Sequence, residues 1–170
     1  VSSNPSHLRN VNGNLLLAAS DPVNGRQIWK LVPNPFNLSR LTSISVLGVP
    51  GVIVSEMVSV NGTAFFSASL GVPNLAPELL KLNSAVPGGA AKVTNVANVS
   101  NLTAVNSNLF FTQSPQLGGP ILSAMAFNAQ LATNIRTFNL IPNGEYPVPK
   151  NLVNVNGTLF FTAATAVEGR

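Results

Sequence analysis

Runs of large apolar residues alternate with short polar segments rich in Asn, Gly and Pro along the whole chain. Four of the boundaries share one pattern, in which Val-Asn-Gly or Val-Asn-Ser is soon followed by two or three large apolar residues. The pattern begins at Val11, Val60, Val105 and Val155, at spacings of 45 to 50 residues. A regular spacing of this length is typical of repeat architectures, in which each repeat contributes one small structural unit.

Each Val-Asn-Gly step predicts a β-hairpin, because Asn-Gly is the preferred pair in a type I′ turn, where both residues need a positive φ. We expect one strand to end at each Val and another to begin after each turn. In the third repeat Ser replaces Gly, and because Ser is unfavourable at positive φ, that hairpin is expected to use a different turn. The predicted turn residues are Asn12, Gly13, Asn61, Gly62, Asn106, Ser107, Asn156 and Gly157.

The strand after each turn carries consecutive large apolar residues, including the pairs Phe65-Phe66, Phe110-Phe111 and Phe160-Phe161. Neighbouring residues on a strand point to opposite faces of the sheet, so both faces are expected to be buried and these pairs to lie in the core. Sheets that are joined by short hairpins and buried on both faces are typical of β-propeller blades or, alternatively, of a β-solenoid.

Further apolar runs follow each hairpin and give four short strands per repeat. Segments 75–82 and 123–132 come closest to a helical composition, but they are short and lack a strong cap, so strand or loop is predicted there. We therefore expect an all-β, β-propeller-like chain with about three and a half four-stranded blades. It forms a single repetitive domain over residues 1–170, with repeats at about 1–50, 51–96, 97–146 and 147–170, the last one incomplete.

The composition indicates a surface built mainly from neutral polar groups. Only 8% of the residues are charged, whereas about 25% is usual in soluble domains. No apolar run approaches the roughly 18 residues of a membrane helix, so no membrane insertion is expected. The formal charge of +4 comes from nine scattered Lys and Arg residues, which argues against a nucleic-acid partner. Cysteine is absent, which excludes disulfides and thiolate metal sites.

Groups for catalysis or metal binding are few. His7 is the sole histidine and Asp21 the sole aspartate, and the glutamates are Glu56, Glu78, Glu145 and Glu168. Acid–base catalysis and metal sites need two or more such groups close together, so we expect no catalytic residues, no metal, no cofactor and no enzymatic activity. Asp21 also begins a segment similar to an oxygen-rich calcium loop, but a single carboxylate favours a tight turn instead.

Five Asn-x-Ser/Thr sequons are present. Those at Asn61 and Asn156 are explained by the hairpin turns. The sequons at Asn37, Asn98 and Asn101 are candidate glycosylation sites, and glycans there would solubilise a surface with few charges.

The first repeat, over residues 8–31, resembles the ELWxxDGT repeat of bacterial extracellular and cell-surface proteins. It matches the family's glycine and its leucine-tryptophan-lysine run at Gly25, Ile28, Trp29 and Lys30. The second repeat has Leu in place of Trp and carries its matching residues at Glu78, Leu79 and Lys81. The family's Asp-Gly-Thr is missing after both runs, so no turn or ion binding attached to it is carried over. The resemblance implies propeller-like blades in an extracellular, non-enzymatic scaffold.

The sequence ends in mid-blade, because Gly169 follows Val155 at the same distance as Gly25 follows Val11. An incomplete blade exposes unpaired backbone groups and apolar faces, which favour pairing with another chain. Either the chain is a segment of a longer array, or a neighbouring copy completes the half blade. Repeated head-to-tail pairing of copies makes a filament, and a surface with few charges adds little repulsion between copies.

These patterns predict a structural protein that self-assembles as a head-to-tail homopolymer, and the family resemblance implies that it is extracellular or on the cell surface. The alternative is a lectin-like or adhesive binding module, a segment of a larger propeller that binds glycans. Trp29 and Tyr146 are the aromatic residues best suited to stacking on a sugar, although the apolar strand around Trp29 favours core packing.

Overall fold

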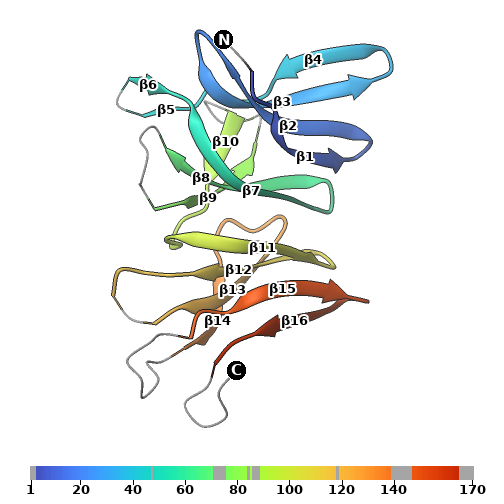
Figure 1. Ribbon diagram of the computed structural model, residues 1–170. Helices are drawn as coiled ribbons and strands as arrows, with labels where there is room; N and C mark the ends of the chain where they lie inside the picture. The colour runs from blue at the N-terminus through green and yellow to red at the C-terminus, as the bar shows by residue number, and fades with distance from the viewer. Residues whose placement is uncertain are drawn as a thin grey trace.

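The computed structural model describes residues 3–46, 48–70, 76–83, 85, 89–117, 119–138 and 147–164. These residues form an all-β structure whose sheets are antiparallel, and the described part holds no helix. Four main sheets follow one another along the chain (Figure 1). The all-β prediction is therefore confirmed.

The first three sheets have four strands each, joined in sequence order. Sheet 1 consists of β1 (Ser6–Val11), β2 (Asn14–Asp21), β3 (Gly25–Pro33) and β4 (Phe36–Arg40). Sheet 2 consists of β7 (Val52–Val60), β8 (Thr63–Leu70), β9 (Glu78–Leu82) and β10 (Ala90–Lys92). Sheet 3 consists of β11 (Val99–Val105), β12 (Asn108–Gln113), β13 (Ile121–Ala126) and β14 (Thr133–Thr137). β9 and β13 show that the two segments with a nearly helical composition contribute strands.

Sheet 4 has two strands in the described part, β15 (Lys150–Val155) and β16 (Thr158–Thr162). A small hairpin, β5 (Ser45–Val46) and β6 (Val49–Pro50), lies between sheets 1 and 2 in the sequence and was not expected. Each of the four main sheets falls within one of the four predicted repeats.

The hairpin turns have the backbone angles that their sequences require. Asn and Gly have φ values of 50° and 76° in the first turn, 46° and 73° in the second, and 50° and 82° in the fourth. Both values are positive, as in a type I′ turn. In the third turn Asn106 has a φ of 52°, while Ser107 does not have a positive φ. This turn differs from the other three because a serine side chain is strained in the left-handed region.

The sheets are stacked face to face in chain order, and the first strand of each sheet lies beside the first strand of the next (Figure 1). One hydrophobic core lies between sheets 1 and 2 and includes Leu16, Ile28 and Phe66. A second core lies between sheets 2 and 3 and includes Phe65 and Phe111. A strand such as β8 therefore contributes to two cores, one on each face, as its consecutive apolar residues predict.

The last Phe pair does not follow this rule. Phe65 and Phe66 are fully buried, and so is Phe111, but Phe160 and Phe161 are exposed. The expectation that this pair lies in the core is wrong. Phe161 points toward sheet 3, where its ring packs edge to face against Phe138 at 6.3 Å between centroids, but 38% of the residue stays exposed. Phe160 lies on the outer face of sheet 4, and the outer face of a sheet is buried only by the sheet that follows it. No sheet follows sheet 4 in the described part of the chain.

Every first strand also contains a β-bulge. The pairing with the second strand shifts between Ser6 and Arg9 in β1, and β11 and β15 shift at the equivalent places. In β7 the shift lies between Val54 and Glu56. His7, Asn101 and Asn151 lie at these bulges and have φ values of 54°, 57° and 54°. A bulge leaves backbone groups without their usual partners in the ladder, so they are available to other groups.

Candidate assembly interface

Polar contacts between consecutive sheets recur at equivalent positions of the first strands. Arg9 lies two residues before the repeated Val, and its Nε donates a hydrogen bond to the carbonyl oxygen of Met57 at 2.7 Å. Thr103 occupies the same position in sheet 3, and its Oγ1 donates to the carbonyl oxygen of Leu152 at 3.2 Å. Met57 and Leu152 are themselves equivalent. The same side-chain position thus contacts the same backbone position of the following sheet.

The hairpin turns form a second row of contacts. Asn61 Nδ2 donates to Ser107 Oγ at 2.8 Å, and Asn106 Nδ2 donates to the carbonyl oxygen of Gly157 at 3.1 Å. The side chain of Asn12 lies against Gly62 in the same way. In each case the first turn residue of one sheet reaches the second turn residue of the next, so the stacking register is fixed at the turns.

Glu56 joins sheets 2 and 3 through the bulge of β11. Its Oε1 accepts a hydrogen bond from the backbone N–H of Asn101 at 2.8 Å, and its Oε2 accepts one from Leu102 at 2.7 Å. The sequence singled out Glu56 only as one of few carboxylates. Glu56 lies four residues before the repeated Val. The other repeats carry His7, Asn101 and Asn151 at this position, so a carboxylate there is the sequence signal that could have indicated the contact.

The outer face of sheet 4 is apolar and open. Val153 is paired with Phe160, so the two side chains share a face, and Val155 alternates onto that face too. Val155 and Phe160 are 47% and 55% exposed, whereas the equivalent Val60 and Phe65 are 1% and 0% exposed. We call Val153, Val155 and Phe160 the tail face.

The outer face of sheet 1 is a second open apolar surface. Leu15 is paired with Leu31, Leu31 with Leu38, and Leu17 with Trp29, so these five side chains share one face. We call them the head face. Leu38 is 58% exposed and the other four are half-buried. In sheet 2, the residues equivalent to Leu17 and Trp29 are Phe66 and Leu80, and both are buried against sheet 1.

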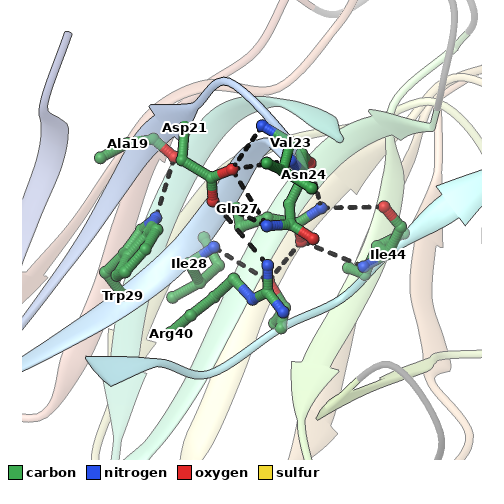
Figure 2. Close-up of polar contacts among 10 residues, drawn as sticks. Ala19, Asp21, Val23, Asn24, Gln27, Ile28, Trp29, Arg40 and Ile44 are labelled. Carbon is green, nitrogen blue, oxygen red and sulfur yellow. Dashed lines mark hydrogen bonds and ion pairs between the residues drawn. The ribbon is translucent and has the colours of Figure 1, made fainter. Parts of the chain in front are cut away.

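Trp29 lies on the head face and is half-buried, so the expectation that it packs in the core is wrong in part. Its Nε1 donates a hydrogen bond to the carbonyl oxygen of Ala19 at 3.0 Å (Figure 2). This bond holds the indole ring along the sheet. The strand is apolar on both faces, but in the described part no other sheet covers the face that carries Trp29.

Asp21 organises the turn between β2 and β3 (Figure 2). Its Oδ1 accepts hydrogen bonds from the backbone N–H groups of Val23 at 2.8 Å and Asn24 at 2.7 Å, and its Oδ2 lies 3.8 Å from Arg40 Nη1. The Asn24 N–H is the largest cause that lowers the pKa of Asp21 below its ordinary value of 3.8. These contacts agree with a tight turn. Across the described residues, no three His, Cys, Asp or Glu side chains gather around a point where a metal ion could bind.

Gln27, beside this turn, is buried and fully hydrogen-bonded, and the sequence did not mark it. Its Nε2 donates to the carbonyl oxygens of Asn24 and Ile44, both at 2.9 Å. Its Oε1 accepts from Thr42 Oγ1 at 2.8 Å and from the backbone N–H of Ile44 at 3.0 Å (Figure 2). Gln27 therefore ties sheet 1 to the segment that leads toward sheet 2.

Replacing Asp21 with Asn is expected to lower the melting temperature at pH 7 but not at strongly acidic pH. The pKa of Asp21 is lowered in the folded state, so its contribution is fully present above the unfolded-state pKa. The contribution is lost as the pH falls through the lower folded-state pKa. Thermal unfolding of both proteins, followed by circular dichroism from pH 7 to pH 2, measures the difference. A difference of equal size at both ends of this range would contradict the prediction.

The candidate glycosylation sites lie in different surroundings. Asn37, in β4, and Asn98 are exposed. Asn101 is half-buried, and its Nδ2, the atom that would carry a glycan, lies 3.4 Å from the carbonyl oxygen of Pro149 in the contact between sheets 3 and 4. A glycan on Asn101 would have to displace this contact.

The other residues singled out from the sequence are not brought together. The Nε2 of His7 lies 3.0 Å from the carbonyl oxygen of Ser55, across the contact between sheets 1 and 2. Tyr146, Glu145 and Glu168 lie outside the described residues. In the described ranges, no helix is long and apolar enough to cross a membrane.

An open cleft of about 410 Å³ lies near the turns between sheets 1 and 2. Leu16 and Ala64 line it, and the equivalent positions between sheets 2 and 3 hold the larger Phe65 and Leu109. The cleft therefore reflects smaller side chains at one of the repeated interfaces.

No protein-family model matches the chain, and no curated protein matches it. Among solved structures, it is similar to the crystal structure of TolB from Acinetobacter baumannii, with 12% sequence identity and a TM-score of 0.48. The match covers 93% of this chain and 41% of that one, so the chain spans less than half the length of the TolB structure.

Proposed function

We propose that this protein is an extracellular structural protein that self-assembles, with a neighbouring copy covering the open face of sheet 4. In this proposal each four-stranded sheet is one blade of a propeller-like array, and sheet 4 is the first half of a further blade. The assembled form is a filament. The protein has no catalytic role in this proposal, and its partner is another copy of itself.

The observation that carries the proposal is the tail face. The residues equivalent to Val155 and Phe160 are buried by the following sheet at the interface between sheets 2 and 3. Burying one Val or Phe side chain contributes about 1.5 to 3 kcal/mol. A cluster of three such residues on one exposed face is therefore a surface on which association is favourable.

The charged residues of the described part support a structural role. Glu56 and Asp21 accept hydrogen bonds from backbone groups, and Glu78 Oε1 contacts Lys92 Nζ at 2.5 Å. Arg9 and His7 contact backbone carbonyls of the next sheet. Glu56, Arg9 and His7 connect sheets, Asp21 orders a turn, and the Glu78–Lys92 pair joins two strands of sheet 2. The low number of charges also leaves little repulsion between copies.

Static light scattering over a concentration series, with negative-stain electron microscopy of the same samples, tests the proposal. We expect the scattering mass to rise with concentration and regular fibres to form. Phe160→Asp places a charge in the tail face and is expected to abolish the rise. Leu117→Asp is the control, because Leu117 is highly exposed but lies outside both open faces. It is expected to assemble like the unmodified protein.

Monodisperse monomers at every concentration would overturn the proposal. If such monomers were also retained on a glycan matrix, the alternative reading as a lectin-like or adhesive module would be favoured.

A further inference from the structure

We propose that the tail face of one copy is covered by the head face of a second copy, in the same register that joins consecutive sheets within the chain. This inference rests on the proposed self-assembly and names the surface that completes it. The partner is a second copy of this chain, and the contact joins sheet 4 of one copy to sheet 1 of the other.

The head face carries residues at the positions that cover the preceding sheet elsewhere in the chain. Leu17 is equivalent to Phe66 in sheet 2 and to Phe111 in sheet 3, and both of these are fully buried. Phe66 belongs to the core shared with sheet 1, and Phe111 belongs to the core shared with sheet 2. Sheet 1 presents the same apolar positions with no preceding sheet in the described part. The head face is therefore similar to the apolar surfaces of sheets 2 and 3 that cover the preceding sheet within the chain, and it could cover a tail face in the same way.

The turns give independent support for the register. A Cβ atom added at Gly62 would meet the side chain of Asn12, and one added at Gly157 would meet the side chain of Asn106. A Cβ atom at Gly13 would meet nothing within 4 Å. Gly13 is therefore the turn glycine against which no Asn side chain lies. Asn156 is the turn Asn at the other end of the stack, where no sheet follows sheet 4 in the described residues. In the proposed contact, Asn156 of one copy lies against Gly13 of the next, as Asn106 lies against Gly157.

The head and tail faces are different surfaces, so the contact is heterologous. Each added copy covers one tail face and presents another, and the assembly stays open at both ends. This arrangement continues the direction in which sheets 1 to 4 are already stacked.

Disulfide cross-linking tests the contact directly, because the chain contains no native cysteine. An Asn156→Cys variant and a Gly13→Cys variant are mixed at a concentration where the unmodified protein assembles, and the mixture is oxidised with copper phenanthroline. We expect the mixed dimer to predominate, and each variant alone to remain largely unlinked. The combined Asn61→Cys and Ser107→Cys variant is the matched control, because these turn side chains are in contact within one chain and should cross-link intramolecularly.

A second measurement does not depend on disulfide geometry. Phe160→Asp blocks the tail face and Leu38→Asp the head face, so neither variant should assemble alone, but their equimolar mixture should form a limited 1:1 dimer in analytical ultracentrifugation. Two results would overturn the head-to-tail contact while leaving self-assembly standing, provided that the unmodified protein assembles. One is that the Asn156→Cys variant cross-links only to itself, and the other is that the mixture of the two Asp variants forms no dimer. An unmodified protein that stays monomeric would overturn both.

Discussion

Replacing Phe65 with Ala is expected to lower the free energy of unfolding by about 3 to 5 kcal/mol, because it removes a large side chain from a filled core. Phe65 is fully buried between sheets 2 and 3, where it packs with Leu109 and Phe111. The same variant also removes the contact of Lys81 Nζ with the Phe65 ring at 5.8 Å. Urea unfolding followed by circular dichroism, at a concentration where the protein is monomeric, measures the change.

Phe160→Ala is the matched control, since Phe160 occupies the same position in the last repeat but lies on the open tail face. Substitutions at exposed positions usually change stability by about 0.5 kcal/mol or less. The monomer should therefore tolerate Phe160→Ala, while assembly should be weakened. An equal loss of monomer stability in the two variants would show that the burial difference between the second and fourth repeats is not as described.

Replacing Glu56 with Gln is expected to lower the free energy of unfolding by about 1.5 to 3 kcal/mol, the range for hydrogen bonds to charged groups. Two carboxylate oxygens of Glu56 accept from two adjacent backbone N–H groups, those of Asn101 and Leu102. A Gln side chain has one acceptor oxygen, and its amide group would face the second N–H, donor to donor. Urea unfolding measures the loss of stability.

Hydrogen exchange at the amides of Asn101 and Leu102 gives a local readout of the same variant, and both are expected to exchange faster. The control is Glu78→Gln, because Glu78 contacts a side chain of its own sheet, Lys92 Nζ, so exchange at the amides of Asn101 and Leu102 should stay unchanged in it. If the two variants raised exchange at the bulge equally, or if exchange there were unchanged in Glu56→Gln, Glu56 would not hold sheets 2 and 3 together as its contacts indicate.

The strands were predictable because their signals are local. The Val-Asn-Gly step predicts the hairpin through the backbone preferences of two residues, and Ser107 marks the turn that departs from the others. The consecutive apolar residues of β8 predict two buried faces, and both faces are buried. The order of strands within each sheet follows from short connections between neighbours.

The other features depend on partners that are distant in the sequence. The bulge of β11 is satisfied by Glu56, which lies one repeat earlier, so no pattern within one strand predicts it. Gln27 is buried because Thr42 and Ile44 fold back onto it. Trp29 and Phe160 carry the same apolar signal as buried residues in other repeats, but the signal reports the residue type and not whether a neighbouring sheet covers it. The sequence therefore predicts the repeat well and its two ends poorly.

The stacked arrangement also bears on how the chain acquires its structure during synthesis. Each sheet is made from strands that are adjacent in the sequence, and its main contacts join it to the sheet before and the sheet after. Contacts that are local in the sequence require little loop closure and favour rapid folding. A nascent chain can therefore fold one sheet at a time as the ribosome releases it, with each completed sheet serving as the template for the next. Biosynthesis and stacking then proceed in the same direction, from the N-terminal sheet onward.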